Sequence, residues 1–251
     1  MLVIVNADDL GGSEEINNEV FELMASGLVT SATIMANAPA FRQAAQRLQN
    51  FPNASFGVHL NLTAFAPIGG SSGLERILDE NGHLSKELFR TAIDGSLQNA
   101  LLRELTLQVE RALRAGVPVS HFDSHHHVHT IPKLFPVLKS LQRRFGVRKV
   151  RSTINLLPPG QKLSGLRSLK KGLFRLGLRH YYATKSPEGL GDFCDFYTAF
   201  RSGNMPRFQS LELMVHPGTT NPGYIAEVDC LRSDWLGSLP PGFQLGSYHS
   251  M

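Results

Sequence analysis

The segment HFDSHHHVH, residues 121–129, holds five of the ten histidines of this 251-residue chain together with one aspartate. An expression tag would account for such a cluster only at a chain end, and this segment lies mid-chain. Imidazole and carboxylate groups are the ligands that proteins use for catalytic divalent metals. The segment therefore indicates either a metal site or a polar loop that happens to be rich in histidine.

Polar side chains also follow several apolar segments elsewhere in the chain. The segments LVIV, ASFGVHLNL, PVSHF, VRKV and LELMV each end in residues of this kind. These residues are Asp8, Asp9, His59, Asn61, Asp123, Arg151 and His216. In folds built on parallel strands, chemistry gathers where the carboxyl ends of the strands meet. We therefore expect these side chains to converge on one active site.

Each residue also has a purely structural interpretation. Asp8 and Asp9 could cap a helix, His59 could be a hydrogen-bonded core histidine, and His216, before Pro217, could belong to a turn. Two adjacent carboxylates after a buried strand nevertheless repel each other unless a cation or a proton offsets their charge. One aspartate with two or three histidines is a set that holds a hydrolytic divalent metal and leaves positions open.

Within the histidine cluster, the spacing separates the residues into two groups. If the backbone is extended, alternate residues share a face. His125, His127 and His129 would then lie together as ligands or as supports for ligands, and His126 would point away.

Apolar and amphipathic segments alternate along the chain. The expected strands are residues 2–5, 28–36, 54–62, 118–126, 147–153, 211–218 and 243–248. The expected helices are residues 14–25, with Ser13 as N-cap, 41–50, 104–116 and 131–146. Residues 64–83, rich in Gly, Pro and Ser, are expected to form a long loop. This alternation predicts an α/β fold with a mainly parallel sheet, either a barrel or a doubly wound sheet.

The amino-acid composition limits the class of protein only broadly. The hydrophobic content of 42% and charged content of 18% are ordinary for a globular protein, and a net charge of +4 is too small to indicate nucleic-acid binding. Cys194 and Cys230 are expected to be reduced, since they form no metal or redox motif. We find no apolar run long enough for a signal peptide or a membrane span, so a cytoplasmic protein without an integral membrane segment is expected.

Five motifs together resemble the YdjC/ChbG family of carbohydrate deacetylases. They occur in the family's order and span nearly the whole chain: NADDLG (6–11), GLVTSATIMAN (27–37), GVHLNLT (57–63), HFDSHHHVH (121–129) and MVHPG (214–218). The resemblance implies a single catalytic domain over residues 1–251 with a distorted (β/α) barrel like that of polysaccharide deacetylases. It also implies a divalent metal, Mg²⁺ or Zn²⁺. The implied reaction is hydrolysis of the N-acetyl group of an amino sugar or oligosaccharide, a carbon–nitrogen bond outside peptides.

The resemblance also implies roles for individual residues. Asp9, His59 and His125 fall on the metal-ligand positions, Asp8 on the catalytic base, and His216 on a C-terminal histidine that we interpret as the acid protonating the leaving amine. The remaining residues are expected to contact the substrate or to support the ligands: Asn61, Asp123, His127, His129 and Arg151.

Residues 157–190 do not match the family pattern and are expected to form a basic helical insertion or lid. Within it, residues 164–182 place Leu166, Leu169, Leu173, Leu176 and Leu178 among arginines and lysines. The segment is interpreted as an ordinary surface helix, as a lid, or as a contact with an anionic or lipid-linked substrate.

Two other functional classes stay open. One is a metal-dependent hydrolase of another specificity, such as an O-acetyl esterase or a phosphoesterase, although phosphate would need more cations at the strand ends than Arg151. The other is a non-catalytic metal- or sugar-binding protein. A homodimer is compatible with the sequence.

Overall fold

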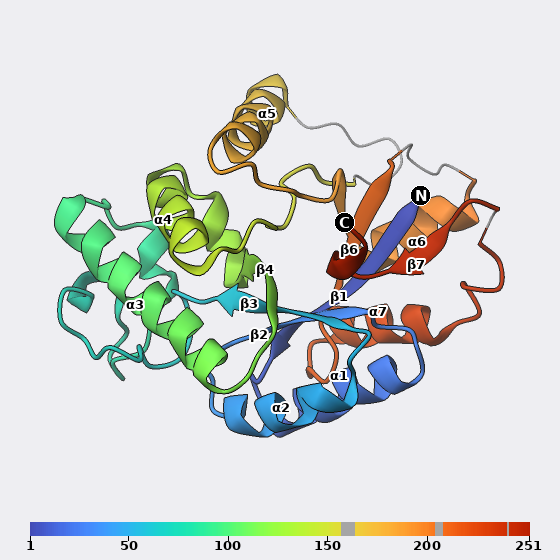
Figure 1. The fold of residues 1–251 in the computed structure, drawn as a ribbon, viewed down its shortest axis with the longest axis horizontal. Helices are drawn as coiled ribbons and strands as arrows, with labels where there is room; N and C mark the ends of the chain where they lie inside the picture. Colours follow the sequence, from blue (N-terminus) through green and yellow to red (C-terminus); the bar gives the residue numbers. More distant parts are fainter. Residues whose placement is uncertain (157–163, 204–207, 240) are drawn as a thin grey trace.

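Seven parallel strands form the centre of the fold in a computed structural model, which describes residues 1–156, 164–203, 208–239 and 241–251 (Figure 1). The strands are β1 (Leu2–Leu10), β2 (Ser31–Ile34), β3 (Ser55–Leu60), β4 (Val119–Ser124), β5 (Gly189–Asp192), β6 (Ser210–Val215) and β7 (Gln244–Gly246). Their order is β4-β3-β2-β1-β6-β5, and β7 pairs with the first residues of β1. The buried strands are rich in Val, Ile, Leu and Phe, as expected for a parallel sheet covered on both faces.

The sheet closes on itself through residues 149–156. This segment is bonded to β4, where the amide of Phe122 donates to Lys149 O at 3.0 Å and the amide of Arg151 donates to Phe122 O at 3.0 Å. At its other end the amide of Leu156 donates to Leu190 O of β5 at 2.6 Å. The two outermost strands are thereby joined, which makes a distorted (β/α) barrel and confirms the predicted fold class.

Seven α-helices in the described part of the chain accompany the strands. They are α1 (Glu14–Ala25), α2 (Phe41–Arg47), α3 (Gly95–Arg114), α4 (Phe135–Phe145), α5 (Gly165–His180), α6 (Phe193–Arg201) and α7 (Pro222–Arg232). The α1 helix begins as the sequence predicted: the Ser13 side chain accepts from the amide of Ile16, and Glu14 and Glu15 occupy the first turn. In Figure 1, α1, α2 and α7 lie on one side of the sheet, and α5 lies on the opposite side.

Several predicted elements differ from the observed ones. The strand expected over 147–153 is reduced to isolated bridges, because this segment changes partner from β4 to β5 instead of following one neighbour. The helix expected from 104 begins at Gly95, where Asp94 accepts from the amide of Leu97 as its N-cap. The strand β5 and the helices α6 and α7 were not predicted. Residues 157–163 of the expected insertion lie outside the described residues.

The histidine cluster is not extended, so the predicted alternation of faces was wrong. Residues His125–Thr130 form the 3-10 segment η4, in which His126 and His127 have φ of 49° and 55°. Left-handed backbone is uncommon for residues other than glycine. Side chains that alternation would separate, such as those of His125 and His126, therefore lie on neighbouring sides of a tight turn.

No described helix combines the length and the hydropathy that crossing a lipid bilayer requires.

Candidate metal centre and active site

The adjacent carboxylates of Asp8 and Asp9 both belong to the end of β1, which continues to Leu10 rather than ending at Val5. Side chains of consecutive strand residues normally point to opposite faces. Here the pairing of β1 with β2 shifts register between Ala7 and Leu10, and Asp9 has a φ of 62°. This irregularity gives the two neighbouring carboxylates separate sets of partners at the end of the barrel.

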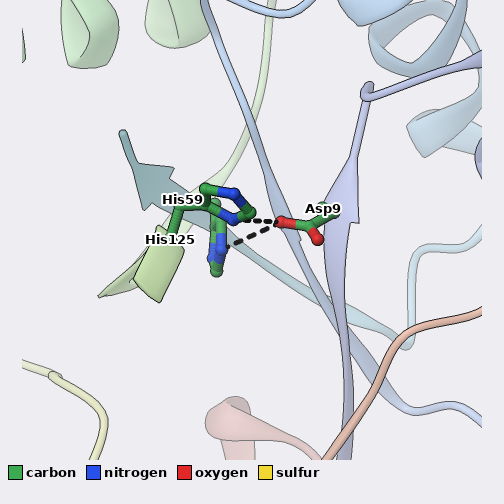
Figure 2. A group of neighbouring side chains, drawn as sticks. All are labelled: Asp9, His59 and His125. Carbon is green, nitrogen blue, oxygen red and sulfur yellow. Dashed lines mark hydrogen bonds and ion pairs between the residues drawn. The ribbon is translucent and has the colours of Figure 1, made fainter. Parts of the chain in front are cut away.

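Asp9, His59 and His125 come together from β1, β3 and the turn after β4, as predicted (Figure 2). The Oδ1 atom of Asp9 lies 3.2 Å from Nε2 of His59 and 2.9 Å from Nδ1 of His125. Their ligand atoms all lie within 4.8 Å of one another. The side chain of His59 is 2% exposed, whereas those of Asp9 and His125 are 17% and 20% exposed. The cluster is thus buried at His59 and accessible to solvent at Asp9 and His125.

The donor set fits a divalent ion. Asp123 Oδ1 lies 2.8 Å from Nδ1 of His59, which makes Nδ1 the protonated nitrogen and turns the lone pair of Nε2 toward Asp9. Thr33 donates to the other oxygen of Asp123 at 2.9 Å. A nitrogen lone pair facing a carboxylate oxygen is repulsive unless a cation lies between them or a proton is added. Two imidazoles and one carboxylate with open positions suit Zn²⁺ or a similar ion.

The same electrostatics appear in the pKa values of these groups. Burial alone would raise the pKa of Asp9, but the neighbouring imidazoles of His125 and His59 hold it well below its usual range. Burial would lower the pKa of His59, but the charge of Asp123 and its hydrogen bond raise it well above the usual value. The site therefore attracts positive charge.

In a second group, Asp8 with His59 and Asp123, the ligand atoms also lie within 4.8 Å of one another. Arg151 already provides the cation there. Its Nη1 and Nη2 donate to the two oxygens of Asp8 at 2.7 and 2.5 Å, and Nη2 lies 2.8 Å from Asp123 Oδ2. A metal at this place would have to displace a buried guanidinium. The cluster of Asp9, His59 and His125 is therefore the better candidate.

Arg151 is completely buried and holds a third carboxylate, Glu212 of β6, whose Oε1 accepts from Nε at 2.9 Å. Tyr248 donates to the other oxygen of Glu212 at 2.6 Å. Burial would raise the pKa of Asp8, but the charge and hydrogen bonds of Arg151 lower it. Arg151 thus keeps Asp8 ionised and fixes its orientation. Because Arg151 has no exposed surface, the structure places it among the residues that support the site.

His216 faces Asp8 from the end of β6. Its Nε2 lies 4.0 Å from Asp8 Oδ2, and its Nδ1 lies 3.3 Å from Oε2 of Glu227 on α7. The ring stacks on Tyr224 with centroids 4.1 Å apart. Burial would lower the pKa of His216, but the hydrogen bond with Glu227 and the charge of Asp8 raise it. Burial also raises the pKa of Glu227, to about 6.

The other predicted residues occupy three different environments. The amide of Asn61 is used internally, since Nδ2 donates to Ala64 O at 2.6 Å and Oδ1 accepts from the amides of Thr63 and Ala64. His129 is buried, with Nδ1 2.5 Å from Ser124 Oγ, and burial lowers its pKa to about 3. Both side chains are buried and bonded to other residues of the protein.

His127, in contrast, lines a cavity of about 370 Å³ between the barrel and α5. Ser152, Thr153, Asn155 and Phe174 are among the other lining residues. His126, expected to point away, packs on His125 with ring centroids 4.0 Å apart and lies 2.9 Å from Thr63 Oγ. It remains outside the candidate ligand group.

Three supporting residues were missed from the sequence. Glu212 had a signal, because a lone carboxylate inside the apolar run LELMV needs a buried cation. Thr33 and Glu227 had none, since threonine is common in strands and glutamate in helices. Their contacts to Asp123 and His216 arise only when β2 and α7 take their places in the barrel.

The barrel and its cluster define an α/β barrel protein with a candidate metal centre at the carboxyl ends of its strands. Residues 2–239 match the family described as YdjC-like protein, so the chain belongs to the YdjC-like family.

Known proteins resemble the chain to different extents. It is 38% identical over 151 residues to a carbohydrate deacetylase of Geobacillus stearothermophilus, a match that covers 59% of this chain and 60% of that relative. It is 30% identical over 230 residues to a carbohydrate deacetylase of Halalkalibacterium halodurans, which covers 91% of this chain and 87% of the relative. The chain thus spans about three fifths of the length of the first relative and most of the second.

One solved structure has the same fold over nearly the whole chain. It is a protein of Enterococcus faecalis V583 described as a candidate cellobiose-phosphate cleavage protein. The TM-score is 0.78 with 22% sequence identity, and the likeness covers 99% of this chain and 98% of that one.

Proposed function

We propose that this protein is a metal-dependent carbohydrate deacetylase that hydrolyses the N-acetyl group of an amino sugar or oligosaccharide to a free amine and acetate. One observation carries the proposal: the Asp9, His59 and His125 cluster lies next to a carboxylate and a histidine, Asp8 and His216, that face each other. The names of the relatives, carbohydrate deacetylases, support the same substrate class.

A divalent ion, Mg²⁺ or Zn²⁺, held by Asp9, His59 and His125 would polarise the acetyl carbonyl and make water a better nucleophile near neutral pH. Asp123 positions His59 for this purpose by bonding its Nδ1, which leaves Nε2 as the nitrogen that would hold the ion. Asp9 and His125 are partly exposed, which gives a substrate access.

Asp8 is the proposed general base. Arg151 keeps this carboxylate in the ionised form that a general base requires. Asn6 donates to Oδ1 of Asp8 at 2.9 Å, and Oδ2 is the oxygen nearer to His216. These contacts fix the carboxylate rigidly beside Asp9 without making it part of the candidate ligand cluster.

His216 is the proposed general acid. An amine leaves an amide only after its nitrogen is protonated, so a proton donor is needed near the scissile bond, and a cationic imidazole can supply the proton. The raised pKa of His216 favours that cationic form at neutral pH, and Glu227 holds its Nδ1 so that Nε2 is the nitrogen facing Asp8.

The position of Arg151, the cation at the strand ends, argues against a phosphoester substrate. Arg151 is fully buried and its donors are directed at Asp8, Asp123 and Glu212, so this cation is not available to a phosphate.

The test is acetate release from a panel of N-acetylated and O-acetylated sugars, before and after chelation and after adding back Mg²⁺ or Zn²⁺. We expect release from N-acetylated sugars that is lost with chelator and restored by metal. Unchanged release with chelator would exclude the metal, and release from O-acetyl substrates alone would exclude the amide.

A further inference from the structure

The helix α5 exposes most of its leucines to solvent. Four of them lie at positions i, i+3, i+7 and i+10, the spacing of one helix face. Their exposed fractions are 65% for Leu166, 59% for Leu169, 59% for Leu173 and 54% for Leu176. An ordinary surface helix turns such a row toward the core, so the interpretation of α5 as an ordinary surface helix does not account for this orientation.

The opposite face of α5 holds the helix on the protein. The ring of Phe174 packs edge-on against Phe135 of α4, with centroids 5.4 Å apart. Leu178 is buried, and a Cβ at Gly177 would lie 3.2 Å from the Phe135 ring. Lys171 donates to Asn155 next to the cavity that α5 lines with His127. The orientation of the helix is therefore fixed by packing, with the leucine row facing outward.

The charge of α5 has one sign. Between Gly165 and His180 the sequence GLRSLKKGLFRLGLRH contains five arginines and lysines and no acidic residue. Lys170 and Arg179 are exposed, and by helix geometry they lie on either side of the leucine row. A row of leucines bordered by cations is the pattern of helices that lie in the interface of an anionic bilayer.

We propose that α5 docks this protein onto the surface of a membrane containing anionic lipid, with Leu166, Leu169, Leu173 and Leu176 inserted at the headgroup boundary. A second copy of the chain fits this surface less well. In a two-fold dimer the patch would meet itself, so cations would oppose cations, and α5 offers no carboxylate to pair with them. Docking in this way needs no spanning helix. It would also bring the cavity beside His127 close to the membrane.

The test is co-sedimentation of the full chain with vesicles of phosphatidylcholine alone or mixed with phosphatidylglycerol. We expect binding to the mixed vesicles only, and weaker binding at high salt. Leu169→Ser with Leu173→Ser should weaken it about 100-fold or more, since each leucine contributes about tenfold or more. Lys170→Gln or Arg179→Gln should each weaken it about fivefold.

Matched controls change exposed residues elsewhere. Leu113→Ser with Ile225→Ser alters two apolar side chains that are 44% and 49% exposed, and Arg42→Gln removes an exposed charge on α2. These should bind vesicles like the parent protein, and thermal melting of every variant checks the fold. Equal binding to both vesicle types would overturn the proposal. The proposal would also be overturned if the parent protein bound neither vesicle type and instead formed a dimer. Sedimentation velocity would detect this dimer, and the double variant Leu169→Ser with Leu173→Ser would dissociate it.

Discussion

Arg151 and Asp8 form a two-pronged ion pair inside the barrel, with donor–acceptor distances of 2.7 and 2.5 Å. The same guanidinium lies against Asp123 and Glu212, so one cation offsets three buried carboxylates. Asp123 in turn bonds His59, a candidate metal ligand. The candidate base and the candidate metal centre therefore share one electrostatic support.

Loss of Arg151 should destabilise the protein strongly. Arg151→Met leaves Asp8, Asp123 and Glu212 buried without their cation, and breaking a buried ion pair in this way costs about 3–5 kcal/mol. Urea unfolding measures the free energy of unfolding of each variant. Arg42→Met, on the exposed face of α2, should change it by less than about 0.5 kcal/mol. If Arg151→Met does not fold, Arg151→Lys is compared instead. Parent-like stability of that variant would contradict the importance of the two-pronged geometry.

Removing a candidate ligand should remove the metal. Asp9→Ala, His59→Ala and His125→Ala should each lower metal content sharply, because each takes away one of three donors. His126→Ala and His83→Ala are controls, the first beside His125 and the second on the exposed loop before α3. Elemental analysis of the purified variants decides the matter. Full metal in all three ligand variants would show that the ion binds elsewhere.

Asp123 should affect metal affinity through His59 alone. Asp123→Asn weakens the bond that orients His59, and such partners of ligand histidines typically contribute 10- to 100-fold in affinity. Glu212→Gln is a close control, since it shares Arg151 with Asp123 but does not touch His59. Zinc titration against a chelating indicator compares the two. If both variants lost zinc affinity equally, the effect of Asp123→Asn would pass through Arg151 and not through His59.

Strand and helix patterns predicted a mainly parallel α/β fold but left a barrel and a doubly wound sheet open, and the resemblance to the YdjC/ChbG family selected the barrel. Apolar runs identified most strands, and polar residues at their ends placed Asp9, His59 and His125 among the candidate site residues, from which the resemblance selected these three as ligands. The features that the sequence did not predict depend on pairing between segments that are far apart in the chain. Residues 149–156 close the barrel by bonding two different strands, and no periodicity marks such a switch.

Two further features were outside the reach of sequence patterns. The turn at His125–Thr130 has left-handed residues that are not glycine, so an extended prediction placed His126 wrongly. The leucine row of α5 was recognised, but the pattern alone could not show that it faces solvent. The direction of a helix face is fixed by its neighbours, here Phe135 and Asn155.

Asp8 should be essential for turnover and dispensable for the metal. Asp8→Asn keeps the size and polarity of the side chain but removes the proton acceptor, so turnover should fall by roughly 10²–10⁴-fold. Metal content should stay at the parent level, because Asp8 bonds Arg151 rather than the ligand group. Acetate release at equal metal content is the measurement. Turnover within a few-fold of the parent would remove Asp8 from the mechanism.

The pH dependence of turnover should report His216. The charged groups around it are Glu227 of α7 and Asp8 and Asp9 of β1, and they raise its pKa against the effect of burial. A general acid must be protonated, so kcat/KM should fall as pH rises through the pKa of His216.

Glu227→Gln should move that decline to lower pH, because it removes the Glu227 charge and weakens the hydrogen bond that raise the pKa. Tyr224→Phe keeps the stacked ring beside His216 and should leave the decline where it is. A decline at the same pH in the parent and in Glu227→Gln would mean that another group donates the proton. His216→Ala then separates the remaining cases: if His216 is the acid, this variant loses the decline together with most of the activity on N-acetyl substrates.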